Sequence, residues 1–96
     1  MNMTTEHDLQ RAHRILDIAM GLFGSDGDSL DPGVHVRSRA GVTVCVDVRD
    51  ARHARLVLAD SDRRALFDAR ITAGEPAKVV RWEGGSWERR FTAADA

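Results

Sequence analysis

The segment Val42–Val48 constrains the fold most, because valine occupies every second position of Val-Thr-Val-Cys-Val-Asp-Val. A period of two is typical of a β-strand with one buried face and one exposed face. Four valines on one face need a covering layer, and the best candidate is an amphipathic segment near the N-terminus. The pattern therefore predicts a helix packed on a sheet.

The N-terminal segment carries the helical signal. Apolar residues recur at steps of three and four from Leu9 to Phe23, which is the spacing of one helix face. Thr5 followed by Asp8 suits the start of a helix, and Gly24 suits its end. We expect a helix over about residues 5–23 and an acidic loop over residues 24–33.

Short alternating segments separated by turn-forming residues fill residues 34–91. We expect up to six strands, at about 34–38, 42–48, 54–60, 66–71, 77–83 and 86–91. The last two are expected to form a hairpin at Gly84-Gly85, with Trp82 across from Trp87. The predicted fold is α+β, with one N-terminal amphipathic helix on a five- to six-stranded antiparallel meander sheet and a short tail over 92–96.

Composition limits the protein class. The chain has 96 residues, of which 43% are hydrophobic and 30% charged, with a single cysteine and a net charge of −1. No apolar run approaches the roughly 20 residues that cross a bilayer, and the acids Glu6 and Asp8 stand where a signal peptide would carry lysines. We expect a single cytoplasmic domain.

One place in the expected sheet brings reactive residues together. A three-residue loop, Arg39-Ala40-Gly41, would set Val36 opposite Val44 and His35 opposite Cys45. Such a pair, with Asp47 two residues along, is the basis for the hypothesis of a small enzyme with a His/Cys site. However, Cys45 lies in the middle of a strand and has no recognisable oxyanion donor or fourth metal ligand nearby. We therefore expect no catalytic residue, metal or cofactor.

Two other features suggest a protein partner. The loop aspartates do not form an EF-hand, because a loop starting at Asp26 would place Leu30 and Arg37 where ligands are needed. An acidic loop can instead dock on a basic surface, and an exposed tryptophan pair with a nearby arginine resembles an interface hot spot. The tryptophans could equally cap the core. The predicted partner-binding residues are Trp82, Trp87, Arg89, Asp26, Asp28 and Asp31.

Nucleic-acid binding is the alternative. Arginines cluster at two expected turns, and they form a predicted basic edge made of Arg49, Arg52, Arg55, Arg63 and Arg64. Interleaved carboxylates such as Asp50 and Asp62 would cancel part of the positive charge that phosphate binding needs. Single-strand binding also uses aromatic residues on an open sheet face, whereas the two tryptophans are expected at the C-terminal hairpin, far from these turns.

The chain has no recognisable catalytic or phosphate-binding motif. By elimination, we expect a small non-enzymatic protein–protein interaction module, in the style of the inhibitors and immunity-type proteins of phages and mobile elements. An open sheet also favours a homodimer, because pairing covers an exposed edge.

Overall fold

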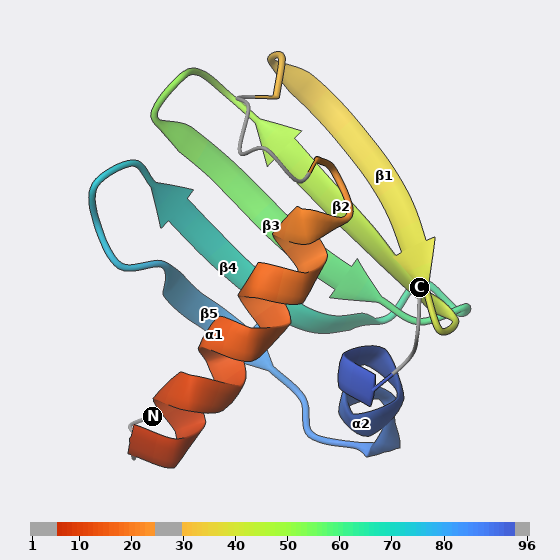
Figure 1. Ribbon diagram of the computed structural model, residues 1–96. Coiled ribbons are helices and arrows are strands. Elements are labelled where there is room, and N and C mark those ends of the chain that lie inside the picture. The colour runs from red at the N-terminus through yellow and green to blue at the C-terminus, as the bar shows by residue number, and fades with distance from the viewer. Residues whose placement is uncertain (1–5, 25–29, 94–96) are drawn as a thin grey trace.

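The computed structural model describes residues 6–24 and 30–93. The elements follow in the order α1 (Glu6–Gly21), β1 (Gly33–Arg39), β2 (Val42–Val48), β3 (His53–Ala59), β4 (Ala65–Thr72), β5 (Lys78–Trp82) and α2 (Ser86–Ala93). The five strands form one antiparallel sheet in chain order (Figure 1). The fold is therefore α+β, as predicted.

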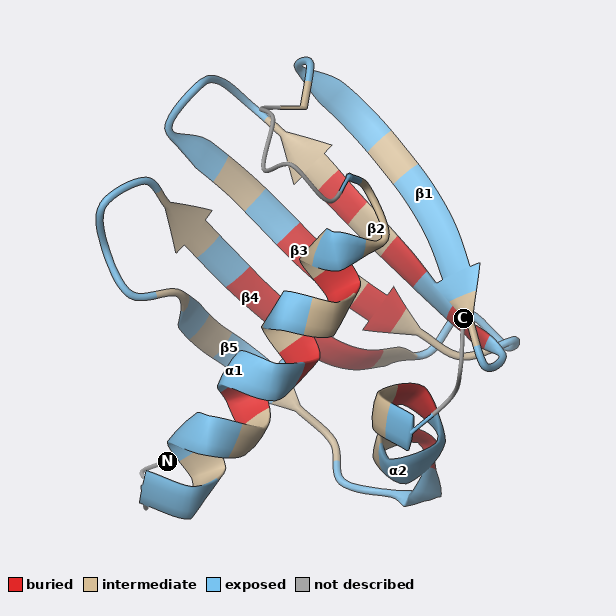
Figure 2. Ribbon diagram, viewed as in Figure 1, coloured by how far each residue is buried: buried red, intermediate tan, exposed pale blue. Residues whose placement is uncertain are grey.

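Helix α1 crosses one face of the sheet (Figure 1). Its buried residues are Ala12, Ile15 and Ala19, at steps of three and four that place them on one side of the helix. They pack against inward-facing residues of β2, β3 and β4, where burial is concentrated (Figure 2). The valine stripe belongs to this core, with Val42, Val44 and Val46 at most 2% exposed. The predicted covering layer is thus present.

The C-terminal segment is a helix, so the predicted sixth strand and its hairpin are wrong. Trp87 and Phe91 are four residues apart, and on α2 both reach the core, where they are 6% and 0% exposed. Gly85 precedes the helix with φ of +155°. A Cβ on Gly85 would lie 3.2 Å from Cδ1 of Trp87, so glycine permits both the backbone turn and the close approach of the indole.

The register of the first hairpin also differs from the prediction. Its loop has two residues, Ala40 and Gly41, with φ of 53° and 80°, as in a type I′ turn. Shortening the loop by one residue moves β1 by one position, which turns each of its side chains to the other face. Val36 therefore pairs with Cys45 and not with Val44.

The inward face of β1 consequently carries His35, Arg37 and Arg39, which pack at the rim of the core. The guanidinium of Arg37 lies 5.4 Å from the ring centroid of Phe23, and the imidazole of His35 meets the same ring edge-on at 6.5 Å. Arg39 donates through Nε to the carbonyl oxygen of Phe91 at 2.7 Å. These contacts let a polar strand edge lie beside an apolar core.

Within the described ranges 6–24 and 30–93, neither helix is both long enough and apolar enough to cross a membrane.

Candidate binding site on the open sheet face

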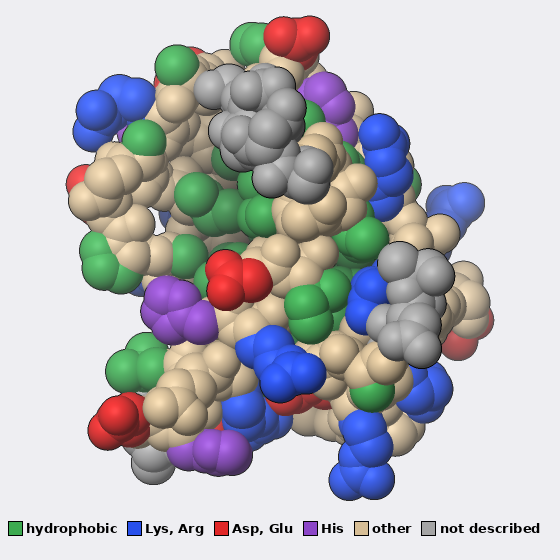
Figure 3. All heavy atoms as spheres, in the orientation of Figure 1, with side chains coloured by type: hydrophobic (Ala, Val, Ile, Leu, Met, Phe, Trp, Pro, Cys, Tyr) green, Lys and Arg blue, Asp and Glu red, His purple; other side chains and the backbone are tan. Residues whose placement is uncertain are grey.

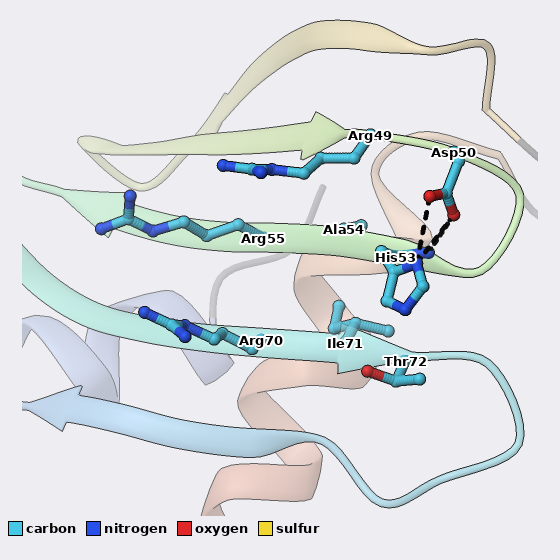
Figure 4. Close-up of a pocket in the computed structure, with 8 residues that line it drawn as sticks. All are labelled: Arg49, Asp50, His53, Ala54, Arg55, Arg70, Ile71 and Thr72. Atoms are coloured by element: carbon cyan, nitrogen blue, oxygen red, sulfur yellow. Dashed lines mark hydrogen bonds and ion pairs between the residues drawn. The ribbon is translucent and has the colours of Figure 1, made fainter.

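The face of the sheet opposite α1, here called the outer face, is the candidate site. Seen from this side, both helices lie behind the strands (Figure 4). The helix-covered side carries acidic, basic and histidine side chains intermixed over its surface (Figure 3). No described helix covers the outer face, so its side chains are available to a partner.

One part of the outer face is apolar. Val34 and Val36 on the edge strand β1 are 62% and 50% exposed. Val36 pairs with Cys45, which in turn pairs with Val57, so these three side chains form a row across β1, β2 and β3. Cys45 and Val57 are half-buried. The row is a small apolar surface that the described part of the chain leaves open.

The next row toward the β2–β3 turn is charged. Arg55 pairs with Asp47 on one side and with Arg70 on the other, and Arg70 pairs with Lys78. The register thus sets three cations directly beside one another on β3, β4 and β5. Like charges in directly opposite positions destabilise a sheet, so this arrangement costs the isolated protein stability.

A third arginine, Arg49, lies directly after β2, across from His53 and one row nearer the β2–β3 turn. In Figure 4, the side chains of Arg49, Arg55 and Arg70 run in the same direction over the outer face. We call these three residues the arginine cluster. They line a hollow of about 440 Å³ whose other walls are Asp50, His53, Ala54, Ile71 and Thr72. The hollow is large enough to receive a side chain of another molecule.

The carboxylates near the cluster are largely engaged within the chain. Asp68, 8% exposed, accepts from Nη2 and Nε of Arg55 at 2.6 and 3.1 Å, and this bond raises the pKa of Arg55. Asp50 accepts from the backbone N–H groups of Arg52 and His53 and from Nδ1 of His53. These bonds, that of Arg52 first, lower the pKa of Asp50.

The other two arginines of the cluster remain without a carboxylate. Among the described residues, the guanidinium groups of Arg49 and Arg70 make no ion pair and no side-chain hydrogen bond. Both residues are exposed. Each therefore presents five unused N–H donors to solvent or to a ligand.

The two tryptophans predicted as partner-binding residues pack against the core, Trp87 buried and Trp82 half-buried, and their role in binding stays a prediction. Trp82 packs edge-on against Phe67 at 5.8 Å, lies beneath the guanidinium of Arg11 at 4.6 Å and donates to Glu88 at 3.2 Å. Trp87 is buried on α2 and donates from Nε1 to the carbonyl oxygen of Glu83 at 2.8 Å. They join β5 and α2 to the core and do not face each other across strands.

The remaining predicted partner-binding residues are dispersed. Arg89 is exposed on α2, and Asp31 is exposed just before β1. The backbone oxygen of Asp31 accepts a hydrogen bond from Nε2 of His35 at 2.7 Å. Asp26 and Asp28 lie outside the described residues. A role of these residues in binding stays a prediction.

The predicted basic edge is not assembled. Arg49 and Arg52 lie at the β2–β3 turn, whereas Arg63 and Arg64 lie at the β3–β4 turn, which is the opposite end of β3. Arg64 is also bound to Glu83, at 2.7 Å. Arg55 joins Arg49 in the arginine cluster, and the third member, Arg70, was missing from the predicted edge. The paired register of β3 and β4 is the signal that identifies it.

The hypothetical pairing of His35 with Cys45, the basis of the small-enzyme alternative, is not formed. His35 pairs with Val46 and faces the core side, whereas Cys45 faces the outer side beside Val36. The sheet separates the two side chains, so they cannot form a dyad.

Searches of protein-family models, curated proteins and solved structures found no match to this chain. Its function is therefore inferred from the geometry of its own residues.

Proposed function

We propose that this chain is a binding module for another protein and that the partner docks on the outer face of the sheet. The observation that supports this proposal is the open face itself, where exposed valines of β1 share the surface with arginines that have no carboxylate partner among the described residues. Protein interfaces combine an apolar centre with arginine-rich polar surroundings. The outer face has this composition.

The size of the face indicates the kind of complex. Five strands at spacings of about 4.8 Å, each about seven residues long at about 3.3 Å per residue, give a surface on the order of 20 by 20 Å. A standard interface buries about 800 Å² on each partner. The outer face is smaller than that, so we expect the partner to cover most of it. Because the face carries several arginines, we expect the affinity to fall as ionic strength rises.

Nucleic-acid binding is the second candidate, and the unpaired guanidinium groups of Arg49 and Arg70 favour it. Three carboxylates, Asp47, Asp50 and Asp68, lie on or beside the same surface, and they weaken the field that attracts phosphates. Single-strand binding on a sheet also uses stacked aromatic residues. The five aromatic residues of this chain lie on the core side of the sheet or on helix α2 and its approach.

The experiment is affinity capture of the tagged protein from its native host lysate, with a nuclease-treated duplicate. The test variant is Val36→Lys, which places a charge in the apolar row at an exposed edge position and so spares the core. The matched control is Arg14→Gln on α1. We expect a protein partner that survives nuclease treatment, is retained by Arg14→Gln and is lost with Val36→Lys.

Two results would contradict the proposal. If the partner is lost after nuclease treatment, nucleic acid is the ligand. If Val36→Lys captures the partner as well as wild type does, the outer face is not the docking surface. Circular dichroism of each variant confirms that folding is intact before the comparison is made.

A further inference from the structure

We infer that the arginine cluster binds the carboxylates of an acidic segment on the partner. This inference rests on the proposed function and specifies the chemistry of the surface that the partner must present. The evidence comes from the cross-strand register, the unsatisfied donors and the composition around the hollow.

The register supplies the first argument. Arg55, Arg70 and Lys78 stand side by side on three neighbouring strands, and only Arg55 has a carboxylate, Asp68, bound to it. By contrast, Arg64 and Arg81 share the carboxylate of Glu83. Among the described residues, no carboxylate is bound to Arg70 or Lys78, so this end of the row carries a local excess of positive charge. An incoming anion would relieve the repulsion.

The donor geometry supplies the second argument. A guanidinium matches a carboxylate with two parallel N–H···O bonds, and Arg55 with Asp68 shows that this geometry is formed on the outer face. Arg49 and Arg70 flank Arg55 on the neighbouring strands and point the same way (Figure 4). Two further bidentate sites are therefore presented on the two sides of a pair that is already formed.

The surroundings of the hollow favour carboxylates of a protein over a nucleic-acid backbone. Asp50 lines the hollow and Asp68 lies beside it, so the positive field is short in range. A long polyanion gains most binding free energy from an extended positive surface. One or two carboxylates gain theirs from a few close contacts. The apolar row of Val36, Cys45 and Val57 is the next row of the sheet, so an acidic segment with apolar neighbours would contact both parts.

The experiment is a titration of the full chain with a capped hexaglutamate peptide, followed by NMR of the arginine Nε–Hε groups. The test variant is the double substitution R49Q/R70Q, because neither side chain holds the fold together. The control is R14Q/R90Q, which removes the same charge from exposed positions on the two helices. An octathymidylate titration under identical salt conditions tests the nucleic-acid alternative.

We expect hexaglutamate to shift the Nε–Hε signals of Arg49 and Arg70, and to bind more weakly as salt is raised. R49Q/R70Q should weaken binding by about tenfold or more, and R14Q/R90Q by less than about twofold. Absence of binding to wild type, equal losses in both double variants, or tighter binding of octathymidylate than of hexaglutamate would each overturn the inference.

The two proposals can fail separately. If R49Q/R70Q still captures the protein partner while Val36→Lys does not, the proposed function holds and the acidic-segment inference fails. If wild type captures no protein although hexaglutamate binds at Arg49 and Arg70, the proposed function fails, and the cluster is an anion site for another class of ligand.

Discussion

Arg55 and Arg70 lie directly opposite each other on β3 and β4, and among the described residues a carboxylate is bound to Arg55 but none to Arg70. Their repulsion costs the isolated protein stability. We therefore expect Arg70→Thr to raise the Tm by about 1 to 3 °C at low salt while weakening hexaglutamate binding. Thermal unfolding at two salt concentrations checks this, because screening should shrink the difference. A lower Tm for Arg70→Thr would contradict the account of the row.

Asp68 supports the arginine cluster from within the sheet. It is nearly buried and holds Arg55 through two hydrogen bonds. Asp68→Asn removes the charge that Arg55 faces, and we expect the free energy of unfolding to fall by about 1 kcal/mol. Urea unfolding measures the change. Asp62→Asn, at an exposed turn position, is the matched control and should be neutral.

The register of the first hairpin can be tested by cross-linking. Val36 faces Cys45, whereas His35 faces the other side of the sheet. Under mild oxidation we expect Val36→Cys to form a disulfide with Cys45, because side chains of directly opposite residues on one face are close enough. His35→Cys should not. Mass spectrometry distinguishes the products, and cross-linking of His35→Cys alone would restore the register predicted from the sequence.

Glu83 gives the protein an acid-sensitive contact between the β3–β4 turn and β5. It accepts from Arg81 and Arg64, each at 2.7 Å, and these bonds, that of Arg81 first, hold the pKa of Glu83 below its ordinary value of 4.5. A carboxylate with a lowered folded-state pKa stabilises the protein above its unfolded-state pKa, and the contribution disappears as pH falls through the folded-state value.

We therefore expect Glu83→Gln to lower the Tm at pH 6, and the difference from wild type to shrink as pH falls below 4.5. Thermal unfolding across this range is the measurement, and Glu75→Gln, at an exposed turn position, is the control. A difference between Glu83→Gln and wild type that persists unchanged at pH 3 would contradict the ionic origin of the effect.

The sequence was sufficient to predict the helix, the first strands and the composition of the core, because periodicity reports directly on which side chains are buried. It was insufficient for the first hairpin, since Ala40 adopts a positive φ that is usual for glycine or asparagine. That one residue changed the loop length and moved His35 away from Cys45. Local patterns therefore predicted the strands but not their register.

The C-terminal helix had a signal that the strand prediction did not use. Trp87 and Phe91 are spaced by four residues, which is a helical interval, and the predicted Gly-Gly hairpin outweighed it. The candidate site was missed in part for a different reason. Arg49, Arg55 and Arg70 come together only through the pairing of three strands, and no single stretch of sequence contains that information.

The central claim is that a protein partner docks on the outer face of the sheet. The most direct measurement is an amide NMR titration of the isotope-labelled chain with the captured partner. We predict that the largest shifts fall on outer-face residues of β1, β3 and β4, including Val36, Arg55 and Arg70. Shifts confined to α1 and α2, with these strands unchanged, would contradict the claim.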